Sequence, residues 1–238
     1  MIPRIVEPPG AVSIVAIAAH PDDIERWCAG TLARSIEAGA TVRLLLVTSG
    51  DSGSSDPHAT RETVRTHRER EARIAADRLG ISEVTFLREP DGAVENTASL
   101  RGALVKWIRC WRPDVLFTHD PEYPDPPYLS HRDHRVVGRA ALDAVYPLAR
   151  DRLAIPQVEI AGLLPHAVHT VWLFASSRAA VYVDIASTFE RKLAARLAHE
   201  SQTSNPTTLA EGWRRFAATT GAPLQLAAAE AFTVLHVD

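Results

Sequence analysis

The sequence has only two cysteines in 238 residues, too few for the disulfide framework of a small secreted domain. We expect both, Cys28 and Cys110, to be buried thiols. No stretch approaches 18 consecutive apolar residues, so no transmembrane helix is expected. The first ten residues lack the basic and apolar regions of a signal peptide. These absences predict a soluble cytoplasmic protein without a membrane partner.

An excess of charge of one sign is also missing. The net charge is −3 and no long cluster of lysine and arginine occurs, which argues against a nucleic-acid partner. We find no internal repeat and no linker between domains. The sequence therefore predicts one domain over residues 1–238, with a core at roughly 11–150 that residues 151–238 complete.

Apolar runs alternate with helical patterns along the first two-thirds of the chain. This rhythm predicts an α/β fold with a Rossmann-like, mostly parallel sheet and helices on both faces. Strands are predicted at residues 14–19, 42–48, 84–87, 115–118, 168–174, 181–185 and 232–237. One helix is predicted from the end of the first strand to about residue 38, and others at 63–79, 100–111, 130–145, 188–199 and 209–219.

His20-Pro21-Asp22-Asp23 follows the first predicted strand directly. Proline favours the first turn of a helix, so these residues are expected on a strand-to-helix turn, where open α/β sheets bind ligands. An imidazole and two carboxylates at the end of a buried strand need a compensating charge, and a divalent metal supplies one. A dinucleotide is not expected, because no Gly-x-Gly-x-x-Gly follows this strand.

A second polar motif, Ser130-His131-Arg132-Asp133-His134, begins the helix after the fourth predicted strand. Ser130 and Asp133 have the spacing of a capping box, which predicts Ser130 as the N-cap. His131 and His134 then lie three residues apart on one face of the helix.

The two motifs meet if the first and fourth strands are close in the sheet, since parallel strands end at one edge. The metal ligands available there are His20, Asp22 or Asp23, and His131 or His134. Two imidazoles and one carboxylate, with the fourth position left for water, form a known catalytic zinc arrangement, although Fe²⁺ also suits this set. The remaining carboxylate and histidine then suit a general base and an oxyanion donor.

The stretches 19–25 (AHPDDIE) and 131–138 (HRDHRVVG) resemble the two signature motifs of the LmbE-like (PIG-L) N-acetylglucosaminyl deacetylase family. The resemblance implies that His20, Asp23 and His134 bind zinc. It also implies that Asp22 is the general base and that His131 stabilises the oxyanion. Members of the family form several assemblies, so a homo-oligomer is a further possibility.

Four more residues are expected to bind substrate: Arg68, Asp91, Tyr128 and His199. Arg68 and Asp91 resemble family positions that hold the sugar, and His199 lies in a C-terminal family pattern. Tyr128 lies in the proline-rich loop 120–129, where it either stacks on the sugar or replaces a tyrosine that some members carry in this loop.

These observations predict a metal-dependent hydrolase that removes the acetyl group from a small molecule containing N-acetylglucosamine. Zinc-bound water is the expected nucleophile and Asp22 the expected base. Two alternatives stay open: an amidase acting on a non-sugar or conjugated amide, and a sugar- or metal-binding module without turnover.

Overall fold

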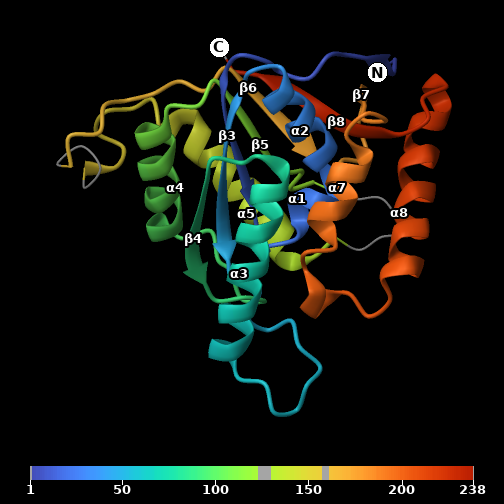
Figure 1. Ribbon diagram of the computed structural model, residues 1–238. Helices are drawn as coiled ribbons and strands as arrows, with labels where there is room; N and C mark the ends of the chain where they lie inside the picture. Colours follow the sequence, from blue (N-terminus) through green and yellow to red (C-terminus); the bar gives the residue numbers. More distant parts are fainter. Residues whose placement is uncertain (1, 123–129, 157–160, 238) are drawn as a thin grey trace.

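The computed structural model describes residues 2–122, 130–156 and 161–237, and in this part of the chain eight strands form one sheet (Figure 1). The strand order is β1-β7-β8-β6-β5-β2-β3-β4. All neighbours are parallel except β8, which runs antiparallel to both β6 and β7. The strands are β1 (Arg4–Ile5), β2 (Ser13–Ala18), β3 (Thr41–Thr48), β4 (Glu83–Glu89), β5 (Val115–His119), β6 (Thr170–Phe174), β7 (Val181–Asp184) and β8 (Ala229–His236).

Helices cover both faces of the sheet, because successive side chains of β2 point to opposite faces and both sets are buried. Ile14 and Ala16 join a core cluster with α2, α3 and α7, whereas Val15 and Ile17 join a second cluster with α4 and α5. The helical elements are α1 (Asp23–Trp27), α2 (Ala29–Glu37), α3 (Arg61–Leu79), α4 (Ala98–Trp111), α5 (Arg132–Asp143), the π-helical turn η1 (Ala144–Leu148), α7 (Phe189–Arg196), the short 3₁₀ turn η2 (Glu200–Gln202), α8 (Pro206–Gly221) and the 3₁₀ turn η3 (Ala222–Leu224). The predicted α/β fold is confirmed.

The neighbourhood of β2 and β5 decides where the polar motifs meet. The two strands pair in parallel, with Ile14 opposite Val115 and Ala16 opposite Phe117. Their carboxyl ends therefore lie side by side, and the loops that follow them open at the same edge of the sheet. The first and fourth predicted strands are therefore neighbours in the sheet, which was the condition for the two motifs to meet.

The helix predicted to run to residue 38 is in fact two helices, α1 and α2, which break at Cys28. The carboxylate of Glu230 on β8 accepts the N–H groups of Gly30 (3.0 Å) and Thr31 (2.7 Å), which belong to the first turn of α2. A buried carboxylate therefore satisfies donors that a continuous helix would bond internally.

Two further expectations were wrong. The N-cap of helix α5 lies one residue later than predicted: it is His131, whose Nδ1 accepts the Asp133 N–H at 3.1 Å, and not Ser130. Cys28 is buried, but Cys110 is exposed. On α4 the buried stripe passes through Leu104, Ile108 and Trp111, and residue 110 points away from it.

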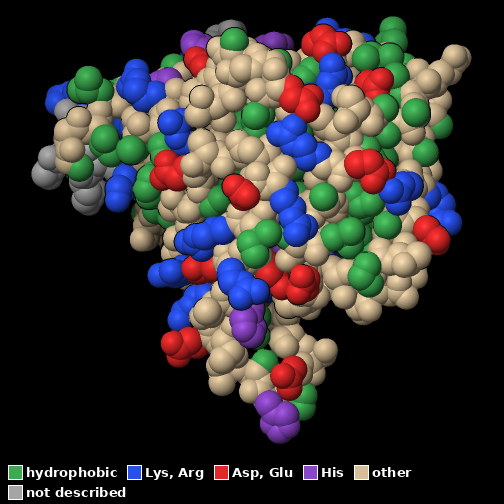
Figure 2. All heavy atoms as spheres, in the orientation of Figure 1, with side chains coloured by type: hydrophobic (Ala, Val, Ile, Leu, Met, Phe, Trp, Pro, Cys, Tyr) green, Lys and Arg blue, Asp and Glu red, His purple; other side chains and the backbone are tan. Residues whose placement is uncertain are grey.

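The surface shown in Figure 2 carries positive and negative side chains interspersed, with no extended field of one sign over that face. Among the described residues, no helix combines the length and the apolar character needed to cross a membrane.

Candidate metal centre and active site

The turn after β2 is organised around the carboxylate of Asp23, the first residue of α1. The His20 N–H donates to Asp23 Oδ2 at 2.7 Å, which folds the turn back on itself. His119, at the end of β5, places its Nε2 3.2 Å from the same oxygen and 3.2 Å from the Ala19 nitrogen. Asp23 is thus tied to both neighbouring strands and is 7% exposed.

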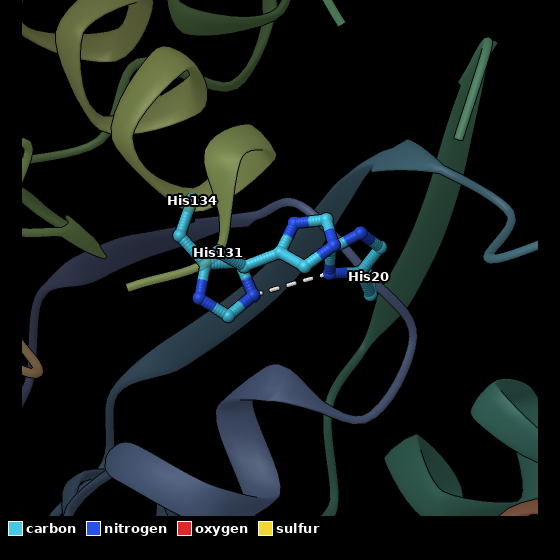
Figure 3. Close-up of side chains that lie close together, drawn as sticks. All are labelled: His20, His131 and His134. Carbon is cyan, nitrogen blue, oxygen red and sulfur yellow. Dashed lines mark hydrogen bonds between the residues drawn. The ribbon is translucent and has the colours of Figure 1, made fainter. Parts of the chain in front are cut away.

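Three of the predicted ligand groups converge on one point. His20 Nδ1 lies 3.1 Å from His134 Nε2, as the dashed line in Figure 3 marks. His134 Nε2 is 3.0 Å from Asp23 Oδ1, and His20 Nδ1 is 3.5 Å from Asp23 Oδ2. Ligands about 2.0–2.1 Å from a tetrahedral zinc ion lie about 3.3 Å apart, so these separations and this donor set fit zinc.

Other ligand sets are contained in the same cluster. His131 also has a ring nitrogen close to those of His20 and His134, and His119 has one close to Asp23 and His134. His119 is fully buried, whereas the side chain of His131 is exposed. One centre with alternative donors therefore exists at this edge, rather than several separate centres.

The outer nitrogen of His20 faces two further carboxylates. Nε2 lies 3.1 Å from Asp91 Oδ1 and 3.5 Å from Asp133 Oδ2. Asp91 also accepts the Ser52 N–H at 2.8 Å, and Asp133 accepts the Gly92 N–H at 2.7 Å. Carboxylates on the outer nitrogen of a ligating histidine fix its tautomer and ring orientation. Asp91, which was expected to hold the sugar, contacts His20 in this structure. The contact between Asp133 and His20 was not predicted from the sequence.

These contacts perturb the protonation of the cluster. Burial disfavours the charged His20, but the charge of Asp23 and the hydrogen bonds to Asp133 and Asp91 outweigh it and raise the pKa of His20 to about 12. The pKa of Asp91 falls to about 2, because its bonds to His20 and Ser52 outweigh burial. Full burial lowers the pKa of His119 to about 4.

Asp22 points away from Asp23, toward α3. It occupies the N-cap position of α1, yet its side chain makes no capping hydrogen bond. Instead Arg68 Nη2 donates to Asp22 Oδ1 at 2.8 Å, and Arg68 Nη1 donates to the Gly50 carbonyl at 2.8 Å. A Cβ on Gly50 would lie 2.1 Å from Arg68 Nη1, and φ is +65° there, so only glycine fits. Arg68, expected to bind substrate, is buried and holds Asp22.

The tautomer of His131 follows from its backbone contact. Because Nδ1 accepts the Asp133 N–H, the proton of the neutral ring lies on Nε2. Partial desolvation, with the nearby charge of His20, lowers the pKa of His131 and favours this neutral form. Its ring centroid is 4.7 Å from that of His20. His131 is therefore a neutral hydrogen-bond donor beside the cluster.

A cavity of about 470 Å³ opens on this cluster, and Asp22, Asp23 and His134 line one side of it. The residues of the other walls were not predicted from the sequence; they come from α1, α7 and α8: Arg26, Trp27, Arg196, Trp213 and Phe216. No spacing in the sequence links α8 to the motifs, so only the fold brings these side chains to the cavity.

Two of the predicted substrate-binding residues are left. His199 has no exposed surface and lies 3.6 Å from the carboxylate of Glu25, so its position gives substrate contact no support. Tyr128 lies outside the described residues. Substrate binding by any of the four residues, Arg68, Asp91, Tyr128 and His199, stays a prediction.

Comparison with known proteins identifies a matching family, similar sequences and similar structures. The sequence pattern of the family described as GlcNAc-PI de-N-acetylase (PIG-L) matches residues 15–145. The diacetylchitobiose deacetylase of Thermococcus kodakarensis is 31% identical over 189 residues, which cover 79% of this chain and 69% of that protein. A 1D-myo-inositol 2-acetamido-2-deoxy-alpha-D-glucopyranoside deacetylase of Kineococcus radiotolerans is 40% identical over 169 residues, 58% of this chain and 46% of that protein.

Among solved structures, the N,N'-diacetylchitobiose deacetylase from Pyrococcus horikoshii, complexed with its inhibitor MPG, superimposes with a TM-score of 0.88. The two sequences are 26% identical, and the superposition covers 95% of this chain and 84% of the other.

Proposed function

The chain belongs to the PIG-L (GlcNAc-PI de-N-acetylase) family, and from this premise we propose that it is a metal-dependent deacetylase of small molecules containing N-acetylglucosamine. The observation that carries the proposal is one cavity lined by Asp22, a carboxylate held by Arg68 and outside the ligand cluster, and by two members of that cluster, Asp23 and His134. The names of the relatives, which are deacetylases of acetylated amino sugars, support this substrate class.

We assign His20, Asp23 and His134 as the zinc ligands, because their mutual distances of 3.0–3.5 Å fit a tetrahedral ion. When bound, zinc lowers the pKa of a ligated water and polarises the acetyl carbonyl. Asp91 and Asp133 keep His20 oriented through its outer nitrogen.

Asp22 is placed to accept the proton of the attacking water. Its carboxylate faces the cavity, and the hydrogen bond from Arg68 fixes its direction. The Nε2–H of His131, beside the cluster, suits the oxyanion that forms as the carbonyl carbon becomes tetrahedral. Asp22, protonated after the attack, then returns its proton to the departing amine nitrogen, and acetate and a free amine result.

The test is acetate release from N-acetylglucosamine and N,N'-diacetylchitobiose by purified protein, before and after chelation and zinc add-back. Asp22→Asn should keep stoichiometric zinc and lose about 10²- to 10⁴-fold in kcat, the range for a general base. Asp77→Asn, on the exposed side of α3, is the matched control and should behave as the native protein. Full activity of a zinc-loaded Asp22→Asn variant refutes the base assignment, and release only from non-sugar amides refutes the substrate class.

A further inference from the structure

The turn at residues 199–202, which contains η2, follows α7 and lies against α3. Helix α7 itself packs against both α1 and α3 (Figure 1). The reaction proposed above needs no group from the 199–202 turn, yet its first residue, His199, is fully buried. Burial of a polar side chain costs free energy unless its contacts compensate, so the contacts of this turn need an explanation.

The carboxylate of Glu71 on α3 fastens the 199–202 turn. Its Oε1 accepts the Ser201 N–H and its Oε2 accepts the Ser201 hydroxyl, both at 2.7 Å. Hydrogen bonds to a carboxylate are about twice as strong as those between neutral groups. Glu71 lies three residues after Arg68, so the two side chains are neighbours on α3. The side of α3 that bonds Asp22 therefore also bonds the turn.

A second contact of the 199–202 turn reaches the loop on which Arg68 rests. Gln202 Nε2 donates to the Gly53 carbonyl at 2.9 Å, in the same loop as the Gly50 carbonyl that Arg68 bonds. A Cβ on Gly53 would lie 2.7 Å from Arg68 Nη1, so the loop packs directly against the guanidinium. The turn thus contacts both the helix that carries Arg68 and the loop that seats it.

The inner side of the 199–202 turn faces α1. His199 Nε2 lies 3.6 Å from Glu25 Oε1, and neither ring nitrogen has a hydrogen-bond partner among the described residues. This contact restrains α1 by packing and charge, without a hydrogen bond. Arg196 Nη2 donates to the Gln202 carbonyl at 2.9 Å and lies 4.0 Å from Asp22 Oδ2. Both ends of α1 therefore lie against groups that the turn holds.

We propose that the 199–202 turn is a positioning element for Asp22, and that Glu71 is the positioning residue through which it acts. With both hydrogen bonds to Ser201 in place, α3 and the loop at Gly53 stay together, and Arg68 directs Asp22 into the cavity. Without them, Arg68 keeps its charge but loses its fixed seat. The inference rests on the proposed function, because it concerns the base of that reaction.

The first test is acetate release from N,N'-diacetylchitobiose by zinc-loaded protein. Glu71→Ala removes both hydrogen bonds and should lower kcat about 10- to 10²-fold, because a misplacement of about 1 Å can cost about 10²-fold. KM should stay unchanged. Glu71→Gln should restore most of kcat, since its amide oxygen can accept the Ser201 N–H and its amide nitrogen can donate to the hydroxyl oxygen.

Two further variants control for folding and for helix packing. Ser201→Ala removes only the hydroxyl bond of an exposed residue, so it should fold and give an intermediate kcat. Arg191→Ala removes bonds of 3.2 and 2.8 Å from α7 to the carbonyls of Arg78 and Leu79, at the other end of α3, and should keep the native kcat. A native kcat in both Glu71→Ala and Ser201→Ala overturns the inference.

A double-mutant cycle separates the positioning of Asp22 from a general loss of packing. Residues that act as one unit give losses that do not add. Glu71→Ala should therefore lower kcat less than about twofold when residue 22 is already changed by Asp22→Asn. An equal loss in both backgrounds overturns the inference, because Glu71 then acts independently of the base.

Hydrogen exchange tests the same contacts without turnover. In Glu71→Ala the amides of residues 22–28 and 50–53 should exchange about tenfold faster than in the native protein, and in Arg191→Ala they should not. Faster exchange together with no acetate release by the native protein supports the hold of the turn on α1 and refutes the deacetylase. Native exchange and native kcat in Glu71→Ala, with acetate release, refute the positioning role and support the deacetylase.

Discussion

Replacing Gly138 by alanine should disturb the metal centre from a distance. Gly138 lies one turn after His134 on the same face of α5, where the helix crosses the end of β5. A Cβ at this position would lie 2.4 Å from the His119 carbonyl oxygen and 3.1 Å from the Pro121 nitrogen. Both are backbone atoms, which cannot rotate away. Helix α5 and the end of β5 must therefore shift relative to each other.

The size of the movement follows from the contact. Carbon and carbonyl oxygen approach to about 3.3 Å at closest, so a separation of 2.4 Å requires a displacement of about 0.9 Å. Overpacking costs about 1–3 kcal/mol, and alanine returns about 1 kcal/mol of helix propensity. The net loss of stability should be about 0–2 kcal/mol, so the variant should fold.

The larger effect should fall on His134, whose Nε2 is held 3.0 Å from Asp23 and 3.1 Å from His20. Metal sites need their ligands within about 0.5 Å of the productive geometry, and a shift near 0.9 Å exceeds this. We expect zinc affinity to fall about 10- to 100-fold and kcat/KM at saturating zinc to fall about 10²-fold.

Competition with a chromophoric chelator measures the affinity, and urea unfolding measures the stability. Gly102→Ala, in α4, is the matched control, because its Cβ would meet its nearest neighbour at an ordinary 3.7 Å. It should gain about 0.5–1 kcal/mol and bind zinc as the native protein does. If Gly138→Ala also binds zinc and turns over normally, the close approach of α5 does not position His134, and the reasoning is wrong.

Three further changes probe other contacts. Asp91→Asn should weaken zinc binding about 10- to 100-fold by loosening His20, and unchanged affinity in the chelator assay would contradict that role. Lys192→Met should cost about 3–5 kcal/mol in urea unfolding, because it removes the charged partner of the buried Glu230 carboxylate; a loss below about 1 kcal/mol would contradict the reasoning. Glu69 has a folded pKa below its ordinary 4.5, so its stabilisation is present above that value and is lost as the pH falls through the folded pKa. In acid titrations of unfolding free energy, Glu69→Gln should show less of this loss, and parallel curves would argue against it.

Local sequence patterns predict this fold well where each element is decided by its own residues. The buried strand β2 follows from its apolar run, and the charged helix α3 ends at Leu79 as predicted, just before Gly80 with φ +81°. The antiparallel β8 could not be predicted, because a short apolar strand reads the same in either direction. The break at Cys28 depends on Glu230, about 200 residues away in the chain.

The candidate site likewise contains some residues that local sequence motifs predict and others that only the fold brings together. His20 and His134 are visible in the sequence because each belongs to a compact motif after a strand. That the motifs meet depends on the pairing of β2 with β5, which no local pattern encodes. The role of Asp133 at His20 was within reach, since it lies inside the second motif. Trp213 was not, because nothing but the fold relates α8 to the turn after β2.

The position of β8 bears on the order in which the protein can assemble during synthesis. This strand leaves the ribosome after every other strand of the sheet, yet it lies between β6 and β7. Strands β2 to β6 can pair with one another beforehand, whereas β7 and β1 can join them only through β8. Until then the edge of β6 stays open, so the nascent chain exposes a strand edge that chaperones or neighbouring nascent chains can bind.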